Sequence, residues 1–132
     1  VDPDLLSRAI EKWKKQDLDF ITNLKPRSFP YGVSCEGIKN SVLRENINQF
    51  TDSNREHVTE WFYQNLDKLR FDNIFSEFDY DSSVSLAVDV EKDLHILEKA
   101  LDGINFPLQK ISVSKLYQNL PNLKQTAHAA SA

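Results

Sequence analysis

Apolar residues alternate in the manner of a β-strand in one stretch of this sequence, at Val84, Leu86, Val88 and Val90. The same stretch also fits a helix that ends before Gly103, whose apolar face holds Val84, Ala87, Val88, Leu94, Leu97 and Leu101. A strand needs a second strand to satisfy its backbone hydrogen-bonding groups. Because no other run alternates in this way, the pattern favours the helix.

Helical spacing also recurs in the first half of the chain. A helix is expected from about Pro3 to Leu24, with Asp2 as its N-cap. The alternative is a break near Gln16, after which Asp17 caps a second short helix. The next helix is expected to follow Ser34 as its cap, with an apolar face made by Ile38, Val42, Ile47 and Phe50. These two segments flank a connection that contains Pro26 and Pro30.

Three further segments complete the helical pattern. Ser53 and Glu56 have the spacing of a capping box, ahead of an apolar stripe formed by Val58, Trp61, Phe62, Leu66 and Leu69. Asp72 is expected to cap a short helix, and a last helix is expected from about Val113 to Leu120. The sequence therefore predicts an all-α fold, a compact bundle of five to six helices in a single domain over residues 1–121, with a flexible tail at 122–132.

The balance of charge argues against several classes of partner. The 132 residues carry a net charge of −4, and residues 72–102 hold nine acidic and two basic side chains. A nucleic-acid partner requires a clustered basic face, which is missing from the sequence. No apolar run approaches the roughly 20 residues of a membrane span. A single cysteine and the lack of a secretory leader at the start of the sequence favour an intracellular location.

The segment Phe29–Asn40 reads FPYGVSCEGIKN and resembles a place for nucleophile chemistry. A nucleophile elbow requires Gly-x-Ser-x-Gly, but Glu36 stands where the second glycine belongs. Cys35 at the start of a helix would have a lowered pKa, which Glu36 beside it opposes. We interpret the segment as a connection in which Gly32 takes a positive φ, with Cys35 as a bystander.

Metal and cofactor chemistry finds little support in the sequence. Asp79, Asp81 and Ser83 match the first ligands of a calcium loop, but valines occupy the required glycine and glutamate positions. Glu91 and His95 stand four residues apart, which is typical of a surface pair on a helix. We therefore predict no metal site, no cofactor and no catalytic residue.

The aromatic content of the chain indicates an exposed surface. Eight Phe, four Tyr and two Trp exceed what a small helical core needs, and the successive aromatics Trp61, Phe62 and Tyr63 cannot all face one core. We expect Tyr63 to be half-exposed, or its helix to be central. The candidate partner-binding residues are aromatic or acidic: Tyr63, Phe71, Asp72, Phe75, Glu77, Phe78, Asp79, Tyr80 and Asp81.

Two functions follow from these residues. The first is a non-catalytic protein–protein interaction module, an adaptor or regulatory domain that docks a basic or amphipathic segment of another protein on this acidic, aromatic surface. The alternative is a carrier that binds an apolar small ligand between helices. In both cases the protein is expected not to be an enzyme, and its oligomeric state is left open.

Overall fold

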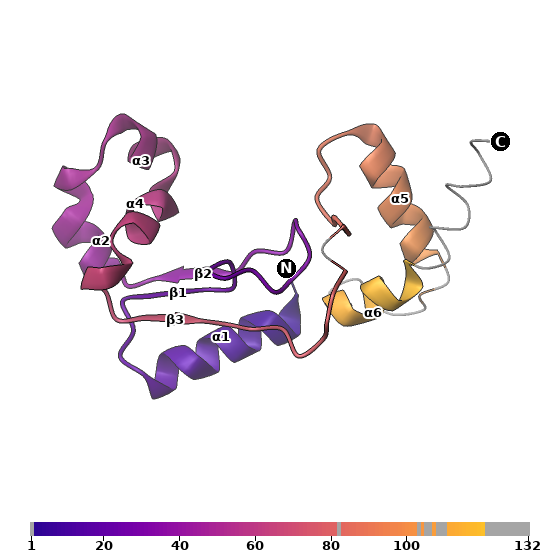
Figure 1. Cartoon of the computed structure of the whole chain (residues 1–132), viewed down its shortest axis with the longest axis horizontal. Helices are drawn as coiled ribbons and strands as arrows, with labels where there is room; N and C mark the ends of the chain where they lie inside the picture. Colours follow the sequence, from indigo (N-terminus) through magenta and orange to yellow (C-terminus); the bar gives the residue numbers. More distant parts are fainter. Residues whose placement is uncertain (1, 82, 103, 105–106, 108–110, 121–132) are drawn as a thin grey trace.

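The computed structural model describes residues 2–81, 83–102, 104, 107 and 111–120. Within these residues the chain forms a mixed α/β fold with six α-helices and a three-stranded sheet of order β2-β1-β3. β1 (Phe20–Thr22) is central; β2 (Glu36–Ile38) pairs with it antiparallel and β3 (Phe71–Asn73) pairs with it parallel. The prediction of an all-α bundle was therefore wrong. Figure 1 shows the sheet between two groups of helices.

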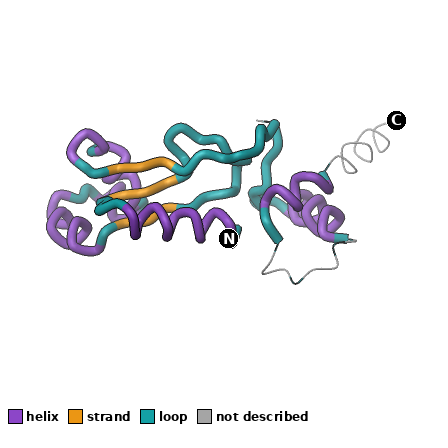
Figure 2. The backbone as a smooth tube through the Cα atoms, turned by 90° about the horizontal axis from the view of Figure 1, so that it is seen from below, coloured by secondary structure: helices purple, strands orange, loops and turns teal. Residues whose placement is uncertain are grey.

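Helix α1 (Pro3–Lys15) begins as the sequence predicts and ends earlier. The Asp2 carboxylate accepts hydrogen bonds from the backbone N–H of Asp4 and of Leu5, at 2.8 and 3.0 Å, which caps the helix. Leu5 and Ala9 are buried in the same core cluster as Ile21 of β1. Figure 2 shows α1 running along the sheet. The helix stops at Lys15, and the chain then enters β1, which the helical spacing of Phe20 had concealed.

Five short helical elements form one end of the molecule: α2 (Asn40–Asn46), η1 (Ile47–Gln49), α3 (Asp52–Glu56), α4 (Val58–Gln64) and η2 (Leu66–Lys68). The predicted cap at Ser34 was wrong, because the residues after it form β2 and α2 begins only at Asn40. A capping box exists before α3, but Thr51 and Asn54 form it.

An aromatic core joins these helices to the sheet. Phe20, Phe50, Trp61 and Phe62 are buried together, and the Phe20 ring lies 5.3 Å from that of Phe62. Tyr63, the third of the successive aromatics, is half-buried, as expected. Its ring meets Phe20 edge-on at 5.2 Å. Since these rings pack against β1, they fix the helical end of the molecule to the sheet.

The opposite end holds α5 (Glu91–Leu101) and α6 (Val113–Asn119). The prediction of helix from Val84 was wrong, since α5 begins only after Val90. Ser85 in the preceding segment forms a parallel bridge with Tyr31, and the Leu86 N–H donates to the Tyr31 carbonyl at 2.7 Å. The predicted tail at 122–132 lies outside the described residues. No helix in the described ranges has the length and apolar character to cross a membrane.

Charged side chains tie the starts of β1 and β3 to the end of β2. Arg70, just before β3, donates to both carboxylate oxygens of Asp19, at 3.0 and 2.7 Å, and also contacts Asp17. Lys39, just after β2, donates to Asp17 at 2.7 Å. Asp19 is buried, and the hydrogen bonds from Arg70 hold the pKa of its carboxyl below its usual range. The cluster therefore fastens β1, β2 and β3 at one end of the sheet.

This cluster predicts a sensitivity to acid. A carboxyl whose pKa is lowered by folding stabilises the native state above its unfolded pKa, near 4, and that contribution disappears as the pH falls through the folded pKa. We expect Asp19→Asn to lower the free energy of unfolding at pH 7 by about 2 kcal/mol and to flatten its decline below pH 4. Urea unfolding from pH 7 to pH 2 measures both effects. Exposed Asp67 is the control, and an Asp67→Asn profile as flat as that of Asp19→Asn would contradict the assignment.

Candidate functional site

The candidate partner-binding residues are spread over several environments. Tyr63 lies on α4, whereas Phe71 and Asp72 belong to β3 and are half-buried. The Phe71 ring stacks on Phe20 at 6.0 Å. The Asp72 carboxylate accepts from Lys12 of α1 at 2.5 Å. These residues therefore hold the sheet to its covering helices.

The remaining candidates follow β3. Phe75 and Phe78 are exposed, at 52% and 51% of their surface, while Tyr80 is half-buried and meets the Tyr117 ring of α6 edge-on at 4.8 Å. Glu77 forms an ion pair with Arg8 at 3.7 Å, and Asp79 and Asp81 are exposed. The exposed aromatic surface is thus limited to two phenylalanines of the nine candidates.

A different group of polar side chains lies where β1 and β3 end. The two strands are parallel, so their carboxyl ends meet at the same edge of the sheet. Thr22, Asn23 and Asn73 stand at this edge and are buried, with 0%, 0% and 5% exposure. Open α/β sheets bind their ligands beyond the carboxyl ends of the strands. This edge is therefore the candidate functional site.

Asn73 holds one arm of the loop that leaves β1. Leu24 and Arg27 form an antiparallel bridge, so Lys25 and Pro26 make a tight turn between them. The Asn73 side chain accepts from the Lys25 N–H at 3.1 Å and donates to the Pro26 carbonyl at 3.0 Å. One buried amide thus satisfies both sides of the turn and fixes it to the end of β3.

Asn23 holds the returning arm of the same loop. Its side chain donates to the Val33 carbonyl at 3.0 Å and accepts from the Cys35 N–H at 2.8 Å. Gly32 lies between the two arms at φ 90°, as the sequence predicts. A side chain is excluded at Gly32, because a Cβ would lie 2.3 Å from the backbone nitrogen of Ala87. The loop from Leu24 to Cys35 is therefore a fixed structure between β1 and β2, whereas the sequence indicated a connection between helices.

The turn that Asn73 fixes carries two exposed cations. Lys25 and Arg27 are exposed, and neither pairs with a carboxylate in the described part of the chain. The Arg27 guanidinium lies over the Tyr31 ring, 5.3 Å from its centre, and makes a long 3.5 Å hydrogen bond to the Pro30 carbonyl. The turn therefore presents positive charge at the carboxyl edge of the sheet.

A directed series of hydrogen bonds begins at Thr22, at the same edge of the sheet. Thr22 and Glu36 are cross-strand partners in the β1–β2 register, and the Tyr63 hydroxyl lies 2.7 Å from Thr22 Oγ1 and 2.6 Å from Glu36 Oε1. A carboxylate has no proton to give, so Tyr63 donates to Glu36 and Thr22 donates to Tyr63. Burial raises the pKa of Tyr63, the bond to Glu36 raises it further, and nearby Arg27 acts in the opposite direction. Glu36 is thus held in place while its carboxylate stays exposed.

Cys35 takes no part in the hydrogen bonds between Thr22, Tyr63 and Glu36. It is half-buried and packs against the core cluster beneath α1. Burial raises the pKa of its thiol, and the adjacent Glu36 carboxylate raises it further. The bystander interpretation of Cys35 agrees with this environment, since a thiolate is disfavoured there.

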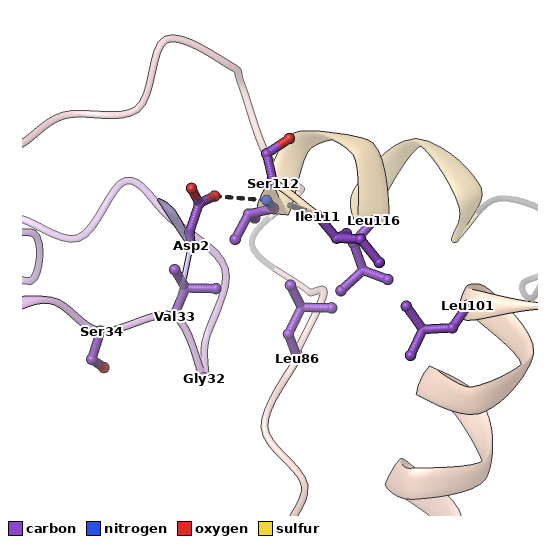
Figure 3. Close-up of a pocket in the computed structure, with 10 residues that line it drawn as sticks. Asp2, Gly32, Val33, Ser34, Leu86, Leu101, Ile111, Ser112 and Leu116 are labelled. Atoms are coloured by element: carbon purple, nitrogen blue, oxygen red, sulfur yellow. Dashed lines mark hydrogen bonds between the residues drawn. The ribbon is translucent and has the colours of Figure 1, made fainter. Parts of the chain in front are cut away.

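A pocket of about 390 Å³ lies on the other side of the loop. Figure 3 shows the Val33, Leu86, Leu101 and Leu116 side chains around it, with Asp2 at its rim. Asp2 Oδ2 accepts from the Val113 N–H at 2.6 Å, in addition to capping α1. The polar group at the rim is therefore occupied in joining α1 to α6. Among the described residues, His, Cys, Asp and Glu do not gather in any group of three that could hold a metal ion.

The fold of this chain is similar to part of a solved structure. No family model matches the chain, and no curated protein matches it in sequence. The solved structure of a cytidylyltransferase from Leptospira borgpetersenii serovar Hardjo-bovis (strain JB197) matches with a TM-score of 0.80 at 22% identity. The match covers 95% of this chain and 52% of that chain, so this chain spans about half the length of that structure. The chain thus has the fold of part of that structure.

This match corrects the function expected from the sequence. The interaction module and the carrier were both expected of an all-α bundle without catalytic residues. The fold is instead α/β, and the matching solved structure is that of an enzyme, so the non-enzymatic interpretation was wrong. The sequence missed the site at the carboxyl edge of the sheet, although Thr22 and Asn23 directly follow the apolar pair Phe20 and Ile21, a signal for the end of a buried strand.

Proposed function

We propose that this chain is part of a nucleotidyltransferase that transfers a cytidylyl group from CTP to an acceptor. The observation that carries the proposal is the TM-score of 0.80 over 95% of the chain with a cytidylyltransferase. The polar edge formed by Thr22, Asn23 and Asn73 supports it, because this is where open α/β sheets bind ligands.

The reaction needs groups that this edge supplies. An acceptor oxygen attacks the α-phosphorus of CTP, the bond between that phosphorus and the bridging oxygen breaks, and pyrophosphate leaves. The acceptor proton must go to a base, and the phosphates must be held by positive charge. Glu36, oriented by Tyr63, is exposed and pairs with Thr22 at the end of β1, from which the turn that carries Arg27 continues. We assign Glu36 as the base and the cations of the turn as part of the anion-binding surface.

Product analysis tests this function even though the acceptor is not identified. The protein is incubated with CTP, Mg²⁺ and a pool of small metabolites, and mass spectrometry searches for new compounds that release CMP on fragmentation. We expect CTP-dependent products together with pyrophosphate, and a rate slower by about 10²- to 10⁴-fold for Glu36→Gln. Arg55→Ala, at an exposed position on α3, is the control and should keep the full rate. Pyrophosphate release equal to that of a protein-free sample would contradict the proposal.

A further inference from the structure

The chain carries more acid than base, and its cations near the sheet are mostly paired. Lys12, Lys39 and Arg70 each contact a carboxylate, of Asp72 in the first case and Asp17 in the others. Lys25 and Arg27 differ, because the described residues offer neither of them a carboxylate within ion-pair distance. Two such cations within three residues leave a local excess of positive charge.

The backbone of the turn that carries these cations is fixed by a buried side chain, and the exposed Tyr31 ring lies against the Arg27 guanidinium. The Lys25 N–H and the Pro26 carbonyl bond to Asn73, whose exposure is 5%. The Arg27 guanidinium is oriented by the Tyr31 ring beneath it. A turn that is held in one conformation before binding loses little conformational entropy when a ligand arrives. Rigid support is what distinguishes a built site from two solvated side chains on a mobile loop.

The donors of Arg27 are available to a planar or tetrahedral oxyanion. Its hydrogen bond to the Pro30 carbonyl is long at 3.5 Å, and stacking on Tyr31 uses only one face of the guanidinium. Guanidinium donors along an edge bind carboxylate and phosphate oxygens in pairs. The Glu36 carboxylate accepts a hydrogen bond from Tyr63, and within the described ranges it forms no ion pair with Arg27.

We propose that the Leu24–Arg27 turn is a binding site for an oxyanion of a reactant, with Arg27 and Lys25 as its cations. This inference rests on the proposed function, which requires two reactants at this edge of the sheet. The oxyanion belongs either to the phosphates of CTP or to an anionic group of the acceptor. Both sources share the chemistry that the turn recognises.

Titrations followed by ¹⁵N–¹H correlation spectra test the site. The probes are inorganic pyrophosphate, CTP and the uncharged nucleoside cytidine, each at about 0.15 M NaCl to screen weak surface binding. We expect pyrophosphate and CTP to shift the Lys25 and Arg27 amide signals, and cytidine to leave them unchanged. CTP binding at least tenfold tighter than pyrophosphate binding would assign the site to the nucleotide, and equal affinities would assign it to the acceptor's anion.

Substitutions in the turn test whether its two cations bind pyrophosphate. Arg27→Ala and Lys25→Ala are expected to weaken pyrophosphate binding at least tenfold, and Arg27→Lys to weaken it by a smaller factor because paired donation is lost. Arg55→Ala should leave the affinity unchanged, and thermal unfolding of each variant checks that it is folded. Unchanged affinity in both turn variants, or shifts confined to other residues, would overturn the site. Since binding is measured without turnover, this outcome is independent of whether a cytidylyl group is transferred.

Discussion

Replacing Gly32 by alanine is expected to destabilise the protein by about 3 to 5 kcal/mol, combining backbone strain with a steric clash. Gly32 has a φ of 90°, which residues with a Cβ seldom adopt. A Cβ would also lie 2.3 Å from the Ala87 nitrogen and 2.6 Å from the Leu86 carbonyl carbon. These contacts are with backbone, so the segment that holds Leu86 and Ala87 must move away from the loop. Urea unfolding followed by circular dichroism measures the loss.

The same substitution should separate two segments that are distant in sequence. The Leu86 N–H donates to the Tyr31 carbonyl, and we expect the Leu86 amide to lose its protection from hydrogen exchange in Gly32→Ala. Ser34→Ala is the matched control, because Ser34 is exposed on the same loop, and its effect should stay within about 0.5 kcal/mol. A Gly32→Ala variant as stable as Ser34→Ala would show that the loop does not pack against residues 86 and 87.

Local signals in the sequence predicted local structure. Asp2 and Pro3 mark the start of α1, Gly32 marks the positive φ, and the last helix occurs at Val113–Asn119, close to the predicted range. Each of these features depends on a few neighbouring residues, through a cap or a backbone conformation. A single sequence contains enough information for such features.

The sheet could not be predicted from the sequence, because its strands are too short to alternate and the central strand is buried throughout. β1 has three residues, all buried, and its first residue, Phe20, continues the helical spacing of α1. β2 contains Gly37, and glycine is more typical of loops than of strands. The alternation at Val84–Val90 does mark a non-helical segment, but its bridge partner is Tyr31 in a loop. Backbone groups of that segment are thus satisfied by a loop, which no alternating run in the sequence could have revealed.

The candidate site depends on contacts between residues that are far apart in the chain. Asn73 binds the turn at Lys25 across 48 positions, and Tyr63 reaches Glu36 across 27. Neither pairing has a spacing that a helix or hairpin would produce, so periodicity cannot reveal it. The docking surface predicted from nine aromatic and acidic residues relied instead on composition. Composition does not distinguish exposed aromatics such as Phe75 and Phe78 from Phe71, which packs against the sheet.

Asn23→Ala is expected to lower the free energy of unfolding by about 2 to 6 kcal/mol, because removing the side chain leaves two backbone groups inside the loop without partners, at about 1 to 3 kcal/mol each. Those groups are the Val33 carbonyl and the Cys35 N–H, and Asn23 itself is completely buried. Urea unfolding measures the loss. Asn40→Ala provides the control, since Asn40 is exposed at the start of α2.

The test of Asn23 also reports on the loop itself. If Asn23 fixes the returning arm, its loss should increase hydrogen exchange at the Cys35 amide and expose the Cys35 thiol, which is otherwise disfavoured as a thiolate because burial raises its pKa. Pyrophosphate affinity at the Leu24–Arg27 turn should fall less than in Arg27→Ala, because Asn73 still holds that arm. Equal thiol reactivity in Asn23→Ala and Asn40→Ala would contradict the role of Asn23 as the support of the loop. If both arms of the loop lose their ordered structure together, Asn23 and Asn73 stabilise one cooperative unit.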